Sequence, residues 1–306
     1  MRTNQIKKLI IRLNVFRSGL IFLGIFSFLF LPKQLPAGPP FRTDDPEPVE
    51  LHHWEVYIFG GYQHSPEADS ASFPALELNY GAIKNLQIHL IVPYALAKTA
   101  GEPLHTGIGD IELGLKYRFL DETDKRPMVG TFPLMEFPAG NADQGLGAGH
   151  YQVFLPVWLQ KSWGHWTSYG GGGYWIASGT PDQNNWLLGW EIQKDLNEHL
   201  MLGGEIFSEI PANDISGTQL DFNLGGQYNF NDKLHLLFSA GRSISGDTDF
   251  MSYLAVQWTL GPSKGRSPGP GRYFNILSQD SGSVHEWLCG SAEKTPGLLS
   301  PAMPIK

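Results

Sequence analysis

The sequence predicts an all-β fold, an antiparallel up-and-down transmembrane β-barrel of roughly 12 strands over residues 54–260. Three observations favour this fold. Apolar residues occupy every second position in one stretch after another, and a period of two is typical of β-strands. The chain has 36 Gly and 9 Trp among 306 residues and only 17% charged residues, which is unusual for a helix-rich soluble protein. Short and long connecting segments also alternate along the chain, as they do in barrels of bacterial outer membranes.

The clearest alternation lies at 107–120, where the sequence is GIGDIELGLKYRFL. Its apolar positions run from Ile111 to Phe119, and the positions between them carry charges and a glycine. A strand of a secreted β-sandwich would keep that polar face in water, whereas a strand of a membrane barrel would turn its apolar face to lipid. Aromatic residues near the ends of many apolar faces favour the barrel, because Tyr and Trp gather at lipid–water interfaces.

The same alternation predicts strands of about 9–11 residues, the length with which a tilted strand crosses a bilayer. No run of 18 apolar residues follows the first 37 residues, so helical spans are not expected. The long connectors are expected at 63–73, 95–106, 138–149, 178–184, 211–219 and 243–250. The strands are expected at 54–62, 75–80, 86–94, 107–120, 128–137, 151–159, 166–178, 186–192, 200–210, 220–230, 234–240 and 252–260.

The two ends of the chain do not share this pattern. Residues 1–37 hold six basic and no acidic residues around the apolar stretch GLIFLGIFSFLF, which predicts a secretory signal peptide, with an uncleaved anchor as the alternative. The Pro- and Asp-rich segment 38–53 is expected to form an extended, plug-like N-terminal arm. Residues 261–306 begin with a Pro/Gly/Ser linker and lack periodicity, so we expect a disordered C-terminal tail.

Charge and cysteine content exclude several function classes. Residues 38–260 contain 11 Lys and Arg against 27 Asp and Glu, a balance of −16. A nucleic-acid partner is therefore not expected, because phosphate binding needs a basic surface. Cys289 is the single cysteine, so neither an intrachain disulfide nor a zinc site with several cysteines is possible.

Three stretches resemble a known family: 107–120, then FPAGNADQGLGAGHYQVFLPVWLQKSWG at 137–164, and GTQLDFNLGGQYNFNDKLHLLFSAGRSI at 217–244. In this order they resemble the bacterial outer-membrane barrel family labelled "MetA-pathway of phenol degradation", over about 48–260. The resemblance implies an outer-membrane, transporter-like channel for small hydrophobic or aromatic compounds. The chain departs from the family at its end, since such barrels usually finish on an aromatic residue, whereas QWTL ends at Leu260 and a tail follows.

If the apolar faces meet lipid, the polar faces line the lumen of the barrel. Acids outnumber bases there, and an acidic pore wall favours cations over anions. For any one of these residues, pairing with a neighbour across the barrel is the alternative role. The lumen-lining candidates are Glu77, His89, Asp110, Glu112, Lys116, Arg118, Glu191, Glu205 and Asp221.

The sequence points to a channel rather than an enzyme. It contains no GxSxG, HExxH or phosphate-loop motif, so it predicts no catalytic residue, metal site or cofactor. A lipid-hydrolysing barrel remains an alternative, with a histidine such as His89 and Ser168 or Ser239, as does a structural or adhesive barrel without transport. The expected partners are outer-membrane lipid, lipopolysaccharide and an unidentified small solute.

Overall fold

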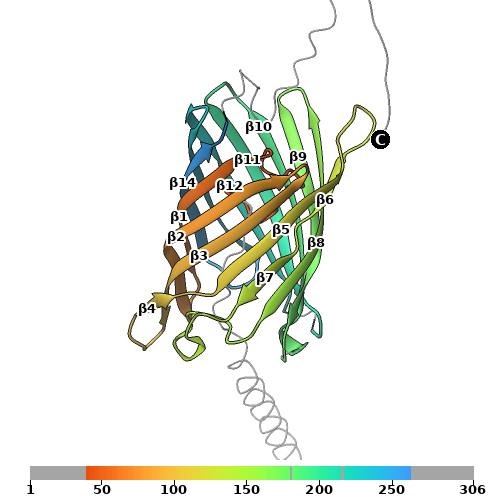
Figure 1. Cartoon of the computed structure of the whole chain (residues 1–306). Coiled ribbons are helices and arrows are strands. Elements are labelled where there is room, and N and C mark those ends of the chain that lie inside the picture. The colour runs from red at the N-terminus through yellow and green to blue at the C-terminus, as the bar shows by residue number, and fades with distance from the viewer. Residues whose placement is uncertain (1–38, 180, 215–216, 263–306) are drawn as a thin grey trace, which may run out of the picture. The chain divides into compact units, whose positions relative to one another are not determined.

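The computed structural model describes residues 39–179, 181–214 and 217–262. They form one closed antiparallel sheet, in which the first strand, β1, pairs with the last, β14 (Figure 1). The predicted signal peptide at 1–37 and nearly all of the predicted tail at 261–306 lie outside the described residues. In the part of the chain that is described, no helix is long and apolar enough to cross a membrane.

The predicted all-β barrel is confirmed. Two strands of its wall are each interrupted once, so that β4 and β5 both pair with β3, and β6 and β7 both pair with β5 and β8. Counting each interrupted strand once, the described wall has 12 strands. The segments are β1 (Trp54–His64), β2 (Ala68–Ile83), β3 (Leu86–Thr99), β4 (His105–Ile108), β5 (Ile111–Leu120), β6 (Met128–Thr131), β7 (Leu134–Phe137), β8 (Gln152–Trp163), β9 (Trp166–Ala177), β10 (Asn185–Asp195), β11 (Leu200–Pro211), β12 (Gln219–Asn231), β13 (Leu234–Ser245) and β14 (Phe250–Leu260), with short 3₁₀ turns at Ala142–Gln144 and Pro181–Gln183.

The interruptions correct the expectation of continuous strands at 107–120 and 128–137. Between β4 and β5, the Asp110 carboxylate turns to the 138–151 connector and accepts hydrogen bonds from the backbone N–H groups of Gly140 (2.9 Å) and Ala148 (2.6 Å). Between β6 and β7, Pro133 has no backbone N–H to donate to the ladder. Each break therefore has a local cause that the alternation of apolar residues does not reveal.

The expected alternation of short and long connectors is wrong at three places. The expected long connector at 243–250 shrinks to 246–249, the same length as 196–199 on the other rim. Strands β1 and β2 extend into the expected long connector at 63–73, which shrinks to residues 65–67. On the opposite rim, the connector at 121–127 is longer than its neighbours at 84–85, 164–165 and 232–233. Connector lengths were thus a weaker guide than the pattern of apolar residues.

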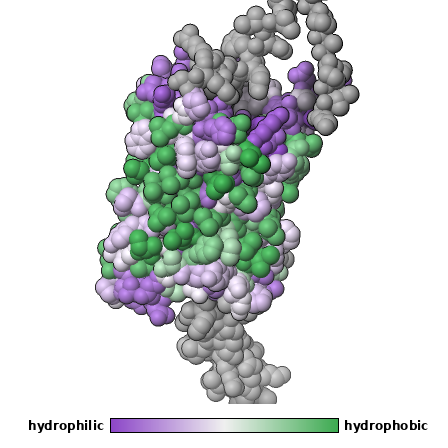
Figure 2. Space-filling view, in the orientation of Figure 1, coloured by the Kyte–Doolittle hydropathy of each residue, from purple (hydrophilic) through white to green (hydrophobic). Residues whose placement is uncertain are grey.

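The outer surface of the barrel is apolar and the inner surface is mainly polar. On β5, Leu113, Leu115 and Tyr117 are exposed, whereas Glu112 and Lys116 between them are buried. On the face that Figure 2 shows, the result is a hydrophobic belt across the middle of the wall, with hydrophilic side chains towards both rims. A continuous apolar surface of this extent is unfavourable in water but is solvated by lipid, so the belt suits a bilayer.

Aromatic side chains lie at both rims of the belt on the first strand. Trp54 at the start of β1 stacks on Tyr80, with ring centroids 4.5 Å apart, and Tyr62 near the end of β1 contacts Phe250, with centroids 6.3 Å apart. Because these amphipathic rings are stable at the level of the lipid headgroups, they fix how deep the strand sits.

Candidate functional site

The N-terminal arm, residues 39–53, runs through the interior of the barrel. Its residues form hydrogen bonds with interior side chains from strands on different sides of the wall, and it joins β1 at the rim where β14 ends. The arm is therefore surrounded by the sheet rather than lying against its outside. Its wall partners are Glu205 and Glu209 on β11, Ser239 on β13, Lys116 on β5, Gln160 on β8 and Gln87 on β3.

One carboxylate on β11 holds the arm through its backbone. The two oxygens of Glu205 accept hydrogen bonds from consecutive N–H groups, Arg42 N at 2.8 Å and Thr43 N at 2.7 Å. Asn223 on β12 also donates to Glu205, over 2.7 Å. A buried carboxylate is stable only when its charge is solvated by donors of this kind, so Glu205 and the arm stabilise each other.

Two ion pairs add side-chain contacts between the arm and the wall. Arg42 Nη2 lies 2.6 Å from Glu209 Oε1, and both side chains are less than one-tenth exposed. Lys116 Nζ lies 2.8 Å from Asp44 Oδ1 and 3.6 Å from Asp45 Oδ1. Both pairs are shielded from water, so breaking either one leaves an uncompensated buried charge.

Two glycines in the wall let the arm approach the sheet closely. A Cβ atom at Gly189 on β10 would overlap the Thr43 side chain, and one at Gly81 on β2 would overlap the backbone carbonyl of Glu50. The backbone of Gly81 is also bonded to the end of the arm, since its carbonyl accepts from His52 N at 2.7 Å. The inner surface is thus shaped to fit the arm as well as bonded to it.

A second polar group, centred on His89, lies on β2, β3 and β5. His89 Nε2 lies 2.8 Å from Glu112 Oε1, and His89 Nδ1 lies 2.6 Å from Asn79 Oδ1. The Asn79 amide donates to Glu77 Oε1 over 2.7 Å. Glu136 on β7 is paired in register with Glu112, so three carboxylates and one imidazole share this part of the interior.

A small cavity adjoins the His89 group. Its volume is about 30 Å³, enough for roughly two water molecules. Its lining includes two aromatic rings, Phe59 and Tyr253, and the carboxylates of Glu77, Glu112 and Glu136. This part of the interior can therefore hold water against carboxylates while presenting aromatic rings.

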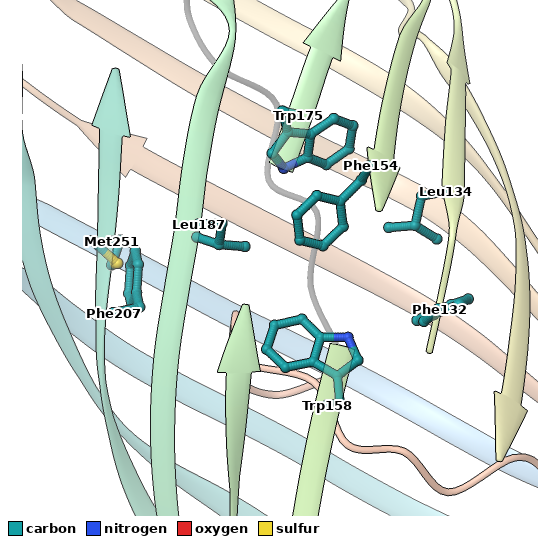
Figure 3. Close-up of a cluster of buried hydrophobic side chains, with 8 residues drawn as sticks. All are labelled: Phe132, Leu134, Phe154, Trp158, Trp175, Leu187, Phe207 and Met251. Carbon is teal, nitrogen blue, oxygen red and sulfur yellow. The ribbon is translucent and has the colours of Figure 1, made fainter. Parts of the chain in front are cut away.

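A third feature of the interior is apolar. Phe154 on β8 stacks on Trp175 on β9, with centroids 4.7 Å apart and planes at 15° (Figure 3). Trp158 lies on the same face of β8, four residues further along, with its ring centroid 6.3 Å from that of Phe154. All three are buried. Barrel interiors are ordinarily polar, so an aromatic group here calls for an explanation beyond filling space. The whole interior aromatic cluster comprises Phe132, Leu134, Phe154, Trp158, Trp175, Leu187, Phe207 and Met251.

The nine candidates from the sequence fall into distinct surroundings. Glu77, His89 and Glu112 belong to one hydrogen-bonded group, and Lys116 and Glu205 bind the arm. Asp110 anchors a connector, Asp221 accepts from Ser243, and Arg118 pairs with Asp121 at 3.0 Å. Glu191 is fully buried, and neither of its carboxylate oxygens has a hydrogen-bond partner.

Several important residues were not among the candidates. Arg42 and Asp44 lie in the arm, whose irregular sequence gave no periodic signal. Glu136 follows the break at Pro133, in a stretch that was treated as an apolar strand. Glu209 is different, because the period of two that places Glu205 in the lumen also places Glu209 there.

The serines considered for a hydrolase are bound to other groups. Ser168 Oγ donates to the carbonyl of Glu191 at 2.8 Å and accepts from Trp190 Nε1 at 2.9 Å. Ser239 Oγ donates to the carbonyl of Pro40 at 2.6 Å. Among the described residues, no three His, Cys, Asp or Glu side chains are grouped so that they could hold a metal ion.

Comparison with known proteins relates the fold to outer-membrane channels. No family model and no curated protein matches the chain. The COG4313 outer membrane channel from Pseudomonas putida F1 has a similar structure, with a TM-score of 0.59 and 16% identity over 71% of this chain and 98% of that one. The KdgM and NanC porins reach only 0.47, at 8% and 10% identity, over 66% and 68% of this chain and 98% and 100% of theirs. The first likeness shows the fold alone, and the other two are too distant to carry an argument.

Proposed function

We propose that the protein is a channel of the bacterial outer membrane that admits small hydrophobic or aromatic compounds, with the arm closing the lumen. The observation that carries this proposal is the interior aromatic cluster. Its rings face the lumen rather than the lipid, so they offer stacking surfaces to a passing solute. The apolar belt, the resemblance to the family labelled for phenol degradation and the likeness to an outer membrane channel support the location and the transport role.

The arm gives the proposed channel a closed state. The arm is held by two hydrogen bonds from its backbone to Glu205 and by two buried ion pairs, yet it contributes no strand to the barrel. The wall can therefore remain intact when the arm moves, because the closure of the sheet depends on β1 and β14 and not on the arm. Lipid and lipopolysaccharide would be its neighbours along the belt and the outer rim.

Permeation into protein-containing liposomes tests the proposal. Phenyl glucoside is larger than methyl glucoside, so a simple sieve admits it more slowly, whereas an aromatic-lined lumen admits it faster. Trp158→Leu should reduce this preference by roughly two- to tenfold, the loss of one aromatic contact. Trp163→Leu is the matched control, because Trp163 is exposed on the outer surface. Slower entry of phenyl glucoside than methyl glucoside would contradict the proposed substrate class.

The hydrolase alternative has less support. A nucleophilic serine needs a neighbouring base, and the two candidate hydroxyl groups instead donate to backbone carbonyls. No described contact favours the adhesive alternative. The structure thus gives the channel proposal a specific lining and a specific closing element, and it gives the alternatives neither.

A further inference from the structure

The guanidinium of Arg42 lies against two residues of β11, Phe207 and Glu209, and a third residue of that strand binds the Arg42 backbone. Glu205, Phe207 and Glu209 occupy alternate positions of β11, so all three side chains face the interior. Glu209 Oε1 accepts from Arg42 Nη2 at 2.6 Å, and Arg42 Cζ lies 5.0 Å from the centroid of the Phe207 ring. Glu205 binds the backbone of the same residue. The guanidinium therefore contacts one carboxylate and one aromatic ring, and a second carboxylate lies on the other side of that ring along the strand.

This combination is a recognition site for a flat organic cation. The ring attracts positive charge through its quadrupole, and a carboxylate adds a charge-assisted hydrogen bond. A neutral compound of the same shape would gain only the stacking contact.

We propose that Glu205, Phe207 and Glu209 form a binding site for small guanidinium or ammonium compounds, which Arg42 occupies while the arm is in place. This rests on the proposed channel function and deepens it, because it assigns a solute class to one position in the lumen. The arm then acts as a tethered competitor. A solute reaches its full affinity only when Arg42 leaves or is removed.

The fit of Arg42 itself supports a site that is not specific for this side chain. Its Nε is buried and has no hydrogen-bond partner, although buried donors are nearly always paired. An anchor serving only this arginine would be expected to satisfy that donor. The site instead makes the contacts that any guanidinium or primary ammonium could make, one carboxylate bond and one ring face.

Binding of phenylguanidinium to the full-length protein in detergent tests the proposal by calorimetry. The control ligand is phenylurea, which has nearly the same shape and no charge. Arg42→Ala empties the site, and its apparent affinity for phenylguanidinium should rise about tenfold or more above that of the parent, because the tethered competitor is gone. Arg42→Met repeats the test with the bulk of the side chain retained. Arg242→Ala is the matched control, since Arg242 is well exposed and pairs with Asp249.

The remaining variants locate the binding. In the Arg42→Ala background, Glu209→Gln or Phe207→Leu should remove most of the gained affinity. Equal binding by the parent and both Arg42 variants, or equal binding of phenylurea, would overturn the proposal and leave Arg42 as an anchor of the arm only. The calorimetry measures binding without any transport, so the two proposals can fail separately. Binding of phenylguanidinium without permeation of any solute would count against the channel. Permeation of aromatic solutes without binding of phenylguanidinium would count against this site.

Discussion

Lys116 on β5 and Asp44 in the arm form a buried ion pair across the interior of the barrel, with 2.8 Å between Nζ and Oδ1. The two residues are 72 positions apart in the sequence. Lys116 Nζ also lies 4.9 Å from the centroid of the Phe132 ring. The pair thus links the arm to both the wall and the interior aromatic cluster. Substitution of either residue therefore tests whether this contact keeps the arm in place.

Replacing Lys116 with Ala should release the arm. Removing one partner of a buried ion pair costs about 3–5 kcal/mol, because the remaining carboxylate is left buried without a counter-charge. We expect a higher conductance in planar bilayers and faster proteolytic cleavage of the arm, while the barrel stays folded. Lys125→Ala, in the 121–127 connector, should change neither quantity. An arm that stays equally protected in Lys116→Ala would show that this pair does not hold it.

The close approach at Gly189 gives a steric test of the same contact. Gly189→Ala should displace the arm, because the added Cβ would overlap the Thr43 side chain. Thr43→Gly should restore the seated arm in the Gly189→Ala background, since it removes the atoms that clash. A double-mutant cycle on the rate of arm proteolysis would measure this coupling. Additive effects of the two changes would place the arm away from Gly189.

Sequence reasoning was sufficient for the architecture of the wall. A one-residue shift in register would turn Glu112 and Lys116 into lipid, so the alternation at 107–120 decides which face is inside. It could not foresee the breaks, because Asp110 is engaged by backbone groups 30 and 38 residues away. The position of the arm inside the barrel was even harder to predict from the sequence. Arg42 and Glu209 are 167 residues apart, and nothing local in either segment indicates their pairing.

The acidic lumen should make the open channel selective for cations. Acids in a narrow pore raise the local cation concentration, and salt weakens the effect over about 10 Å at 0.1 M. Glu112→Gln with Glu136→Gln should lower the cation preference, because it removes two carboxylates from the lumen. The described hydrogen bonds of Glu112 and Glu136 go to His89 and Gln152, so the arm should stay in place. Reversal potentials across a salt gradient measure it, with Glu122→Gln in the 121–127 connector as control. Anion preference in the parent would contradict the role assigned to these carboxylates.

A second pair of substitutions, Glu112→Gln with Glu205→Gln, tests the arm and the preference together. In the structure, Glu205 also binds the arm backbone, so Glu205→Gln changes closure as well as charge. We expect this second pair of substitutions to raise the conductance and lower the selectivity together. A change in selectivity at unchanged conductance would mean that Glu205 does not restrain the arm.

Truncation after residue 262 should leave the barrel intact. All strands of the described wall end by Leu260, and β14 is already paired on both edges with β1 and β13. We expect both the truncated protein and the full chain to insert into membranes and to migrate differently on gels before and after boiling. Loss of the compact form on unboiled gels would show that the last 44 residues are needed for assembly.

The most direct test of the account locks the arm in the lumen. A Cβ at Gly189 would lie 3.1 Å from Thr43 Cβ, and a small outward shift of the arm would bring the two atoms to the roughly 3.5–4.5 Å that a disulfide requires. Thr43→Cys with Gly189→Cys should therefore crosslink in a Cys289→Ser background. Conductance in planar bilayers should be lost on oxidation and return on reduction, and Thr43→Cys alone should not respond. A protein whose disulfide is verified by mass and which still conducts like the parent would contradict closure of the lumen by the arm.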